Sequence, residues 1–469
     1  MIKCLLTVTL LSLAFISFAG CALVHPTDPY VVSVSEQSQT LFSPKSDSSA
    51  LPDSPVTLKE AIRIALENNP DVAVARHEIK AAGARHDQAF ARALPKIDVI
   101  GGYTHEMDNQ RLMQPRYNGE PGVFGDDIFS ANIVLSQPIF TGGRLINEIK
   151  ATKLLRQAAT HQLARTRKAL IFNVSSIFYA ILSQREVITS LVFSQKTLNE
   201  HLKRINDLIA QKKAARVDRL RTEVRIADID QQLTQAKNIL SVENRVMANL
   251  MGISDEKRSI TLTGKLARES ESPGNLDNRI KAALKHRTDY MAARAVLEAH
   301  AKKVDAASAE HWPSISLQGT YGERWAENPS ESPPGTDESE DIGQIGIFVN
   351  LPVFEGGNIA ARVHEERANL ATSQDKLRSL ELSIRLDVET AWLNIDTAQK
   401  RINTTEKAIA QAKETLRIER MKYDQGKGSI TDVLDAQSAM LDSQTNYYRA
   451  LADYNTALAQ MDLATGVVK

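Results

Sequence analysis

The sequence has few of the residues that build disulfide, metal or cofactor sites. Its 469 residues include only two cysteines, Cys4 and Cys21, and both lie within the first 21 positions. The rest of the chain therefore has no disulfide framework and no thiolate metal site. The ten histidines are scattered. Because a zinc site needs three or four convergent ligands, we expect no bound metal and no cofactor.

Charge imbalance and catalytic motifs are also missing. Lys and Arg together number 57, and so do Asp and Glu. This balance argues against a nucleic acid partner. There is no nucleophile elbow, no pair of histidines at helical spacing and no glycine-rich phosphate loop. The sequence therefore predicts that the protein is not an enzyme.

Beyond the N-terminus, no apolar run is long enough for a membrane-spanning helix. Residues 1–20 predict an export signal peptide, with a basic Lys3 followed by an apolar stretch. The segment Phe18-Ala19-Gly20-Cys21 resembles a bacterial lipobox, which predicts lipidation of Cys21. Phe18 departs from the usual leucine, so an ordinary signal peptidase cut is the alternative. Residues 21–56 would form an N-terminal extension.

The most informative positive feature is an internal duplication. The segment from Leu58 reappears 218 positions later from Leu276, and from Pro138 onward the offset settles at 214. Two copies of about 200 residues are too long for a solenoid repeat. We therefore expect a first structural repeat at residues 57–275 and a second at residues 276–469.

Each repeat contains two segments in which apolar and polar residues alternate. This period of two predicts strands at about residues 97–106, 129–140, 314–324 and 342–354. Segments of about ten residues with one apolar face and a tyrosine near one end are typical of outer-membrane barrel strands. A soluble sandwich with one wet face would have the same pattern.

The number of strands limits how such a barrel could form. Four strands are too few to close a barrel, since about eight is the working minimum. A sheet with open edges is not tolerated in lipid. Either the strands lie outside a membrane or several chains pool them, and three chains of four strands would supply 12.

Long segments without proline predict long helices in both repeats. The first runs from Gly143 to about Ala210, roughly 100 Å at the α-helical rise. Its apolar residues follow a heptad seam, and a helix of this length needs coiled-coil packing with its neighbours. The chain reverses near residues 211–216 and again near residues 425–429, so each repeat carries a helical hairpin.

Paired glycines mark the passage from strand to helix. The segment Pro138-Ile139-Phe140-Thr141-Gly142-Gly143 corresponds to Pro352-Val353-Phe354-Glu355-Gly356-Gly357. Glycine permits a sharp change of backbone direction. We therefore assign Gly142, Gly143, Gly356 and Gly357 to strand–helix junctions.

Together these features resemble the TolC family of outer-membrane efflux proteins. The likeness rests on the duplicated halves, the entry LKEAIRIALENNPDVAVAR, the two F-x-G-G junctions and the segment YDQGKGSITDVLDAQ from Tyr423. It implies a fold that is mainly α with a membrane β-barrel. In that fold a homotrimer forms a 12-stranded barrel in outer-membrane lipid and an α-barrel that crosses the periplasm.

The resemblance also implies a function. The protein would be the exit duct of a tripartite efflux or type I secretion system, located in the bacterial outer membrane and extending into the periplasm. Its partners would be a periplasmic adaptor (membrane fusion) protein and an inner-membrane pump. That pump would be either a proton-driven RND exporter or an ATP-driven ABC exporter.

Finally, the resemblance implies a periplasmic gate at the hairpin turns. The pattern Y-x-x-G-x-x-x-x-x-D-x-x-D falls on Tyr423, Gly426, Asp432 and Asp435. In the family, carboxylates here line a narrow aperture. Asp218 matches the acid of the first hairpin. The family's arginine near the second turn is replaced by Gly428, so its link to the first hairpin is absent.

The local charges suggest a substitute for that link. We hypothesise that Arg219 or Arg221 pairs with Asp432 or Asp435 across the hairpins; a solvated charged helix face is the alternative. Partly exposed pairs each contribute about 0.2 to 1 kcal/mol, so only a ring of them would matter. We expect the adaptor to contact the turns, at Lys212, Lys213, Arg216, Gly426 and Gly428.

Two other functions share some of these features. A periplasmic adaptor of an export complex contains a helical hairpin, but normally only one, flanked by β-rich modules. A structural periplasmic coiled-coil protein would not need two pairs of amphipathic strands. The exit duct accounts for the signal, strands, helices and duplication together.

Overall fold

A computed structural model describes residues 55–115, 117–253, 261–268, 274–327, 329–334 and 339–467. The chain divides into two units, Met1–Asp53 and Ser54–Lys469, and all described residues belong to the second. The predicted signal peptide and Cys21 lie outside the described residues. Among the described helices, none combines the length and the apolar character needed to cross a membrane.

The described unit repeats one order of elements twice. The first half contains α3 (Leu58–Asn68), α4 (Pro70–Ala91), β1 (Lys96–Arg111), β2 (Phe124–Thr141), α5 (Arg144–Ala210) and α6 (Arg216–Leu250). The second contains α7 (Leu276–His286), α8 (Thr288–Ser308), the short 3-10 helix η1 (Ala309–His311), β3 (Ser314–Ala326), β4 (Ser339–Asn350), α9 (Asn358–Asp424) and α10 (Ile430–Thr465). Each half thus leads from a helix pair through two strands into a long hairpin.

The helix pairs begin where the sequence supplies capping side chains. The Thr57 hydroxyl accepts a hydrogen bond from the Glu60 amide at the start of α3. The Asn69 side chain accepts from the Asp71 amide at the start of α4, and Pro70 occupies the first helical position. These caps satisfy amides that have no partner within the helix.

The four strands form one antiparallel sheet in the order β1-β2-β3-β4. The register places Tyr103 opposite Phe129 and Phe129 opposite Trp325. β2 and β3 therefore join the two repeats, while β1 and β4 form the edges of the described sheet.

The strands differ in their limits from those expected at residues 97–106, 129–140, 314–324 and 342–354. The first three extend further toward their loops, since backbone pairing continues past the region of regular alternation. β4 begins earlier, at Ser339, and ends at Asn350, before Pro352. Proline has no amide hydrogen for the ladder. In β2 the equivalent Pro138 lies at a register shift.

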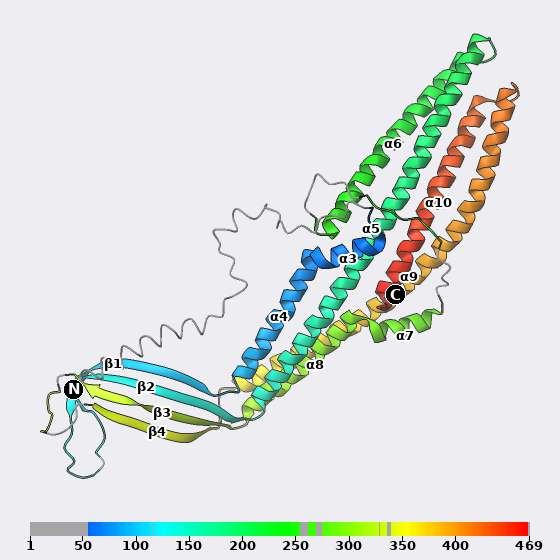
Figure 1. Ribbon diagram of the computed structural model, residues 1–469. Helices are drawn as coiled ribbons and strands as arrows, with labels where there is room; N and C mark the ends of the chain where they lie inside the picture. Colours follow the sequence, from blue (N-terminus) through cyan, green and yellow to red (C-terminus); the bar gives the residue numbers. More distant parts are fainter. Residues whose placement is uncertain are drawn as a thin grey trace. The chain divides into compact units, whose positions relative to one another are not determined.

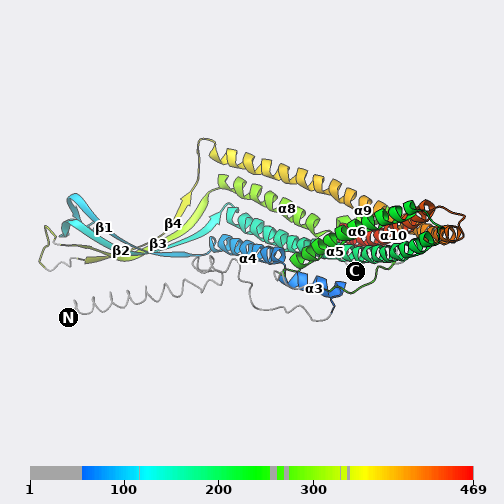
Figure 2. The ribbon, with the colours of Figure 1, turned by 90° about the horizontal axis from the view of Figure 1, so that it is seen from above.

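The two hairpins lie side by side (Figures 1 and 2). α5 and α9 each contain 67 residues, so each is about 100 Å long. α10 packs against both α9 and α5, whereas α6 packs mainly against α5. The main core lies between α9 and α10 and includes Ile384, Val388, Ile395, Ile402, Tyr454 and Met461. A second core joins α5 and α6 through Val187, Leu191, Leu198, Ile229 and Leu233.

The glycine pairs lie between β2 and α5 and between β4 and α9, and they have left-handed backbone angles. Gly142 and Gly356 have φ of 62° and 61°, and Gly143 and Gly357 have φ of 91° and 86°. The two copies nevertheless have different surroundings. A β-carbon on Gly142 would lie 2.5 Å from the Ala309 carbonyl oxygen, whereas one on Gly356 would have no neighbour within 4 Å.

This difference predicts unequal effects for one substitution at equivalent positions. Gly356→Ala should cost about 1 to 2 kcal/mol, the penalty for a left-handed residue with a side chain. Gly142→Ala adds a clash with backbone and should lower the melting temperature more. Circular dichroism melting of both variants measures this. Equal melting temperatures would mean that the junction of the first repeat is not tightly packed against η1.

Candidate functional site

The two hairpin turns are built on the same plan with different residues. Lys212 in the first turn has φ of 59°, and Gly426, which follows it at the repeat offset of 214, has φ of 70°. Among the described residues, Lys212 is the one non-glycine with a positive φ. The first turn thus holds a lysine in a conformation that glycine adopts more easily.

Two of the predicted gate carboxylates, Asp218 and Asp432, cap the N-termini of α6 and α10. Asp218 Oδ2 accepts a hydrogen bond from the Ala215 amide, and Asp432 Oδ2 accepts one from the Ser429 amide, both at 3.4 Å. A negative charge in the first turn also interacts favourably with the helix dipole. Both aspartates therefore help to fix the geometry of their own turns.

Beneath the turns lies a small apolar core. It is formed by Ile205 of α5, Tyr423 of α9, and Ile430 and Val433 of α10. The Tyr423 hydroxyl donates to Asp218 Oδ2 at 3.4 Å, a long hydrogen bond that joins α9 to α6. Burial and the adjacent Asp218 charge raise the pKa of Tyr423 to about 12, so its hydroxyl remains a donor.

Three further residues, His201, Arg204 and Asp424, belong to this region, and no sequence motif marks them. The rings of His201 and Tyr423 lie with centroids 5.3 Å apart. Arg204 Nε lies 2.9 Å from Asp424 Oδ1 and so joins α5 to α9 by an ion pair. Each contact links residues that are more than 200 positions apart, and no local motif marks such pairs.

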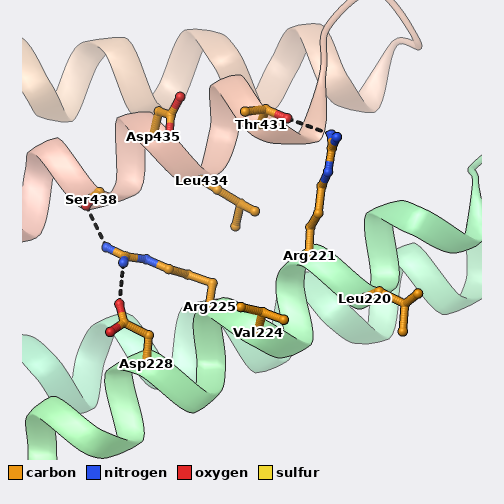
Figure 3. A pocket seen from close by; sticks show the side chains of 9 residues that line it. All are labelled: Leu220, Arg221, Val224, Arg225, Asp228, Thr431, Leu434, Asp435 and Ser438. Atoms are coloured by element: carbon orange, nitrogen blue, oxygen red, sulfur yellow. Dashed lines mark hydrogen bonds and ion pairs between the residues drawn. The ribbon is translucent and has the colours of Figure 1, made fainter.

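A groove of about 770 Å³ separates α6 from α10 near the turns (Figure 3). It is lined by Leu220, Arg221, Val224, Arg225, Asp228, Thr431, Leu434, Asp435 and Ser438. Arg221 donates to the Thr431 hydroxyl at 2.8 Å, and Arg225 donates to the Ser438 hydroxyl at 2.6 Å. Two arginine side chains therefore cross the groove, and Leu220, Val224 and Leu434 contribute its apolar lining.

The hypothesised pairs between arginine and aspartate are not among the contacts of the described residues. Arg221 binds Thr431 instead, and Arg219 lies 3.4 Å from Glu223 on its own helix. Asp435 is exposed at the groove, without a hydrogen bond or ion pair to another described side chain. Within one chain, hydroxyl acceptors replace the expected carboxylates.

The predicted contact residues of the turns are open to solvent. Lys212, Lys213, Arg216 and Gly426 are exposed, and Gly428 is half-buried. A β-carbon on Gly428 would lie 2.9 Å from Lys422 Cβ, which leaves no room for a larger residue in the present turn. The basic first turn and the compact second turn thus offer different surfaces to a partner.

The sheet has one face that is apolar and uncovered by the chain itself. The register puts eight exposed large residues on this face: Ile97, Val99, Tyr103, Ile133, Tyr321, Ile345, Ile347 and Val349. At one end of the face, Tyr103, Phe129 and Trp325 form a row across three strands, with centroid distances of 4.9 and 5.6 Å. Such a face requires an apolar environment.

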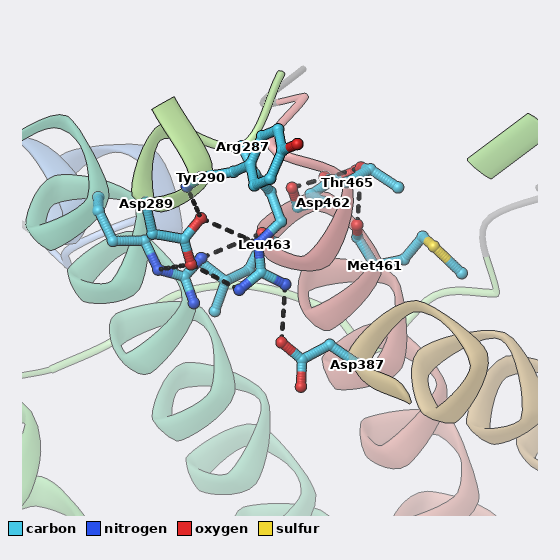
Figure 4. Close-up of polar contacts among 9 residues, drawn as sticks. Arg287, Asp289, Tyr290, Asp387, Met461, Asp462, Leu463 and Thr465 are labelled. Atoms are coloured by element: carbon cyan, nitrogen blue, oxygen red, sulfur yellow. Dashed lines mark hydrogen bonds and ion pairs between the residues drawn. The ribbon is translucent and has the colours of Figure 1, made fainter. Parts of the chain in front are cut away.

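A buried ionic network lies where α5, α8, α9 and α10 meet (Figure 4). Arg287, 2% exposed, donates to Asp289 at 2.6 Å and to Asp387 of α9 at 2.7 Å. Arg165 of α5 reaches Asp289 and the Leu463 carbonyl oxygen of α10. Burial alone would raise the pKa of Asp289, but Arg287 and Arg165 hold it below its usual value.

No group of three or more histidine, cysteine, aspartate or glutamate side chains within the described ranges is arranged to hold a metal ion. The arrangement is instead that of two hairpins joined by weak polar contacts around a groove, together with an apolar sheet face.

A family model described as outer membrane efflux protein matches residues 61–252 and 279–467. The outer membrane protein TolC of Vibrio cholerae is 25% identical over 412 residues, which cover 88% of this chain and 91% of that protein. The Cupriavidus metallidurans cobalt-zinc-cadmium resistance protein CzcC is 19% identical, over 88% of this chain and 90% of its own length. The solved outer-membrane channel OprN has a TM-score of 0.74 at 18% identity and covers 87% of this chain and 89% of its own.

The ionic network yields a prediction about stability. Arg287→Ala would leave Asp387 without its cation and Asp289 with only the longer Arg165 contact, and it should destabilise each chain by about 3 to 5 kcal/mol. Arg401→Ala, which removes an exposed pair between α9 and α10, should cost about 1 kcal/mol or less. Denaturant unfolding in detergent compares them. Similar losses in both variants would show that burial does not strengthen the Arg287 contacts.

Proposed function

The chain belongs to the outer membrane efflux protein family, and we propose that it forms, as a homotrimer, the exit duct of a tripartite efflux or type I secretion system. It is an outer-membrane channel for export. Channels of this family are homotrimers that work with adaptors and inner-membrane pumps. Membership of this family favours the channel over the two alternative functions that the sequence alone left open, a periplasmic adaptor and a structural coiled-coil protein.

The observation that carries the proposal is the open sheet with its uncovered apolar face. Within the described sheet, β1 and β4 pair on one side only. In lipid, each backbone group without a partner costs several kcal/mol, so a spanning sheet must have no free edge. Pairing β1 of one chain with β4 of the next removes both edges, and three chains then contribute 12 strands. The row of Tyr103, Phe129 and Trp325 would lie at a membrane–water interface.

The helices also carry apolar residues that one chain does not cover. On α6 these are Val217, Leu220, Val224, Val242 and Val246, and on α9 they are Leu382, Leu386 and Leu393. The spacing of three, four and seven residues places them along helix faces. In the proposed trimer, α6 of one chain packs against α9 of the next and closes the helical barrel. This contact provides the lateral packing that such long helices need.

The hairpin turns would form the periplasmic gate and the docking end. We propose that the Tyr423–Asp218 contact holds the two hairpins together, while Asp432 and Asp435 line the aperture. Arg219 and Arg221 would contribute cations to this ring through the neighbouring chain. The exposed turns, with Lys212, Lys213, Arg216, Gly426 and Gly428, would contact the adaptor.

A lipid anchor, an adaptor and an inner-membrane pump complete the proposed assembly. Lipidation of Cys21 would tether the chain to the outer membrane in addition to the barrel, since one acyl chain alone binds only reversibly. The adaptor would connect the duct to an inner-membrane pump of the RND or ABC class. The duct itself would perform no covalent step and need no cofactor.

The proposed assembly predicts a heat-sensitive oligomer in the membrane. Membrane fractionation should place the full-length protein with the outer membrane. An unheated denaturing gel should show a trimer that heating converts to a monomer, because heat breaks the strand pairing. A soluble protein that runs as a monomer without heating contradicts the proposal.

The proposed gate predicts a change in conductance. Asp435→Ala should increase single-channel conductance in a planar bilayer, because it removes a carboxylate from the narrowest part of the aperture. Asp442→Ala provides the control, since Asp442 is exposed on the same helix two turns further from the turn. Unchanged conductance in both Asp435→Ala and Arg221→Ala would remove these residues from the gate.

A further inference from the structure

His201 occupies a position that its residue type makes sensitive to pH. It lies on α5 against Tyr423 of α9, with ring centroids 5.3 Å apart and ring planes 60° apart. Its Nε2 atom is buried and has no hydrogen-bond partner among the described residues. At the repeat offset of 214 the equivalent residue in the second repeat is Thr415, which does not titrate. The second repeat therefore has no titratable counterpart of His201 at this position.

The charged groups around His201 disfavour its protonation. α5 contributes Arg204, and α9 contributes Arg420 and Asp424. The one carboxylate of this set, Asp424, is already paired with Arg204 at 2.9 Å. α6 contributes Asp218, which binds the Tyr423 hydroxyl, and α10 contributes the apolar Ile430 and Val433 to the same core. A proton on His201 would thus add a third cation beside two arginines.

Burial and the net effect of the nearby charges both lower the pKa of His201. Burial lowers the pKa of His201 most, and Arg420 lowers it further; the opposite effect of Asp424 is smaller than that of Arg420, and Arg204 adds a further lowering. A charged imidazole would gain some attraction to the Tyr423 ring. That gain is too small to reverse the effect of burial and of the two guanidinium groups. Neutral histidine therefore stabilises the packed tip, and the charged form favours an arrangement in which the ring reaches water.

We propose that His201 is an acid sensor of the periplasmic gate, whose protonation separates it from Tyr423 and thereby releases the Tyr423–Asp218 contact between the hairpins. This inference rests on the proposed function, because it assumes that the hairpin turns close a channel. In the open tip the imidazole is hydrated and has an ordinary pKa near 6.5. As pH falls below about 6.5, the open form binds a proton that the closed form does not, so the equilibrium shifts toward opening.

The size of the effect follows from this linkage. Between pH 7.5 and pH 5.5 a group with a pKa near 6.5 in the open form alone shifts the open-to-closed ratio by up to about tenfold per chain. The three copies in a trimer would make the response steeper. Planar bilayer recordings of the purified full-length protein at both pH values measure the open fraction directly.

Two substitutions at the same position separate titration from packing. His201→Phe keeps an aromatic ring against Tyr423 but cannot take up a proton, so its open fraction should be low at pH 7.5 and should not rise at pH 5.5. His201→Lys places a cation there at both pH values and should be open at pH 7.5. His364→Phe is the control, because His364 is exposed on α9 far from the turn, and it should respond to pH as the unmodified protein does.

The results of these recordings distinguish a failure of the proposed acid sensor from a failure of the proposed channel function. If the unmodified protein opens at pH 5.5 and His201→Phe opens equally, then other titratable groups carry the response. His201 is then not the acid sensor. If the unmodified protein forms channels that do not respond to pH, the sensor is also wrong, while the duct stands. If no variant forms channels at any pH, the proposed function itself fails. An unheated gel confirms that each variant still assembles.

Discussion

The free edges of the four-stranded sheet are the constraint on which the rest of the architecture depends. The described part of a single chain buries neither edge nor the apolar face between them. Because a lipid environment offers no hydrogen-bond partners to backbone, the chain can be stable there only when copies of it pair their strands. Closing the sheet by copies also sets the arrangement of the helices that continue from it. The duplication reduces the number of copies required, since each chain brings two strand pairs and two hairpins.

The long helices, like the sheet, need contacts that one chain does not supply. A helix of about 100 Å cannot be covered by a globular core. α10 lies between α9 and α5, which buries one face of each, whereas the remaining faces of α6 and α9 still carry exposed valines and leucines. Near the helix crossing, Arg287 ties α8 to α9 while Arg165 ties α5 to α8 and α10. The strongest polar contacts between the two halves therefore lie at this crossing, and the contacts nearer the turns are weaker.

The sequence predicted the repeating features well and the isolated contacts poorly. The end of α5 at Ala210 follows from the heptad seam and the turn residues, and the paired glycines mark the two changes from strand to helix. The strand ends did not follow, because β1 continues as paired backbone beyond its alternating residues and β4 stops before Pro352. Within one chain Arg221 contacts Thr431 rather than Asp435, which lies one helical turn further along α10, and the sequence alone does not distinguish these two neighbours. His201 gave no local signal at all, since its partner Tyr423 lies on the other hairpin.

The contacts that close the tip are individually weak, and this weakness is what a gate requires. Per chain they comprise the long hydrogen bond from Tyr423, two hydrogen bonds from arginines of α6 to hydroxyl groups of α10, one tilted aromatic pair, one partly exposed ion pair and the small apolar core beneath the turns. An aromatic pair contributes about 0.5 to 1.5 kcal/mol and an exposed ion pair about 0.2 to 1 kcal/mol. Each of these contacts is therefore weaker than the buried network around Arg287, whose loss should cost about 3 to 5 kcal/mol per chain. In the proposed gate, a docking partner, or a proton on a residue that supports Tyr423, would weaken these contacts. The fold thus combines a strongly bonded crossing of α5, α8, α9 and α10 with hairpin turns that weaker contacts hold together.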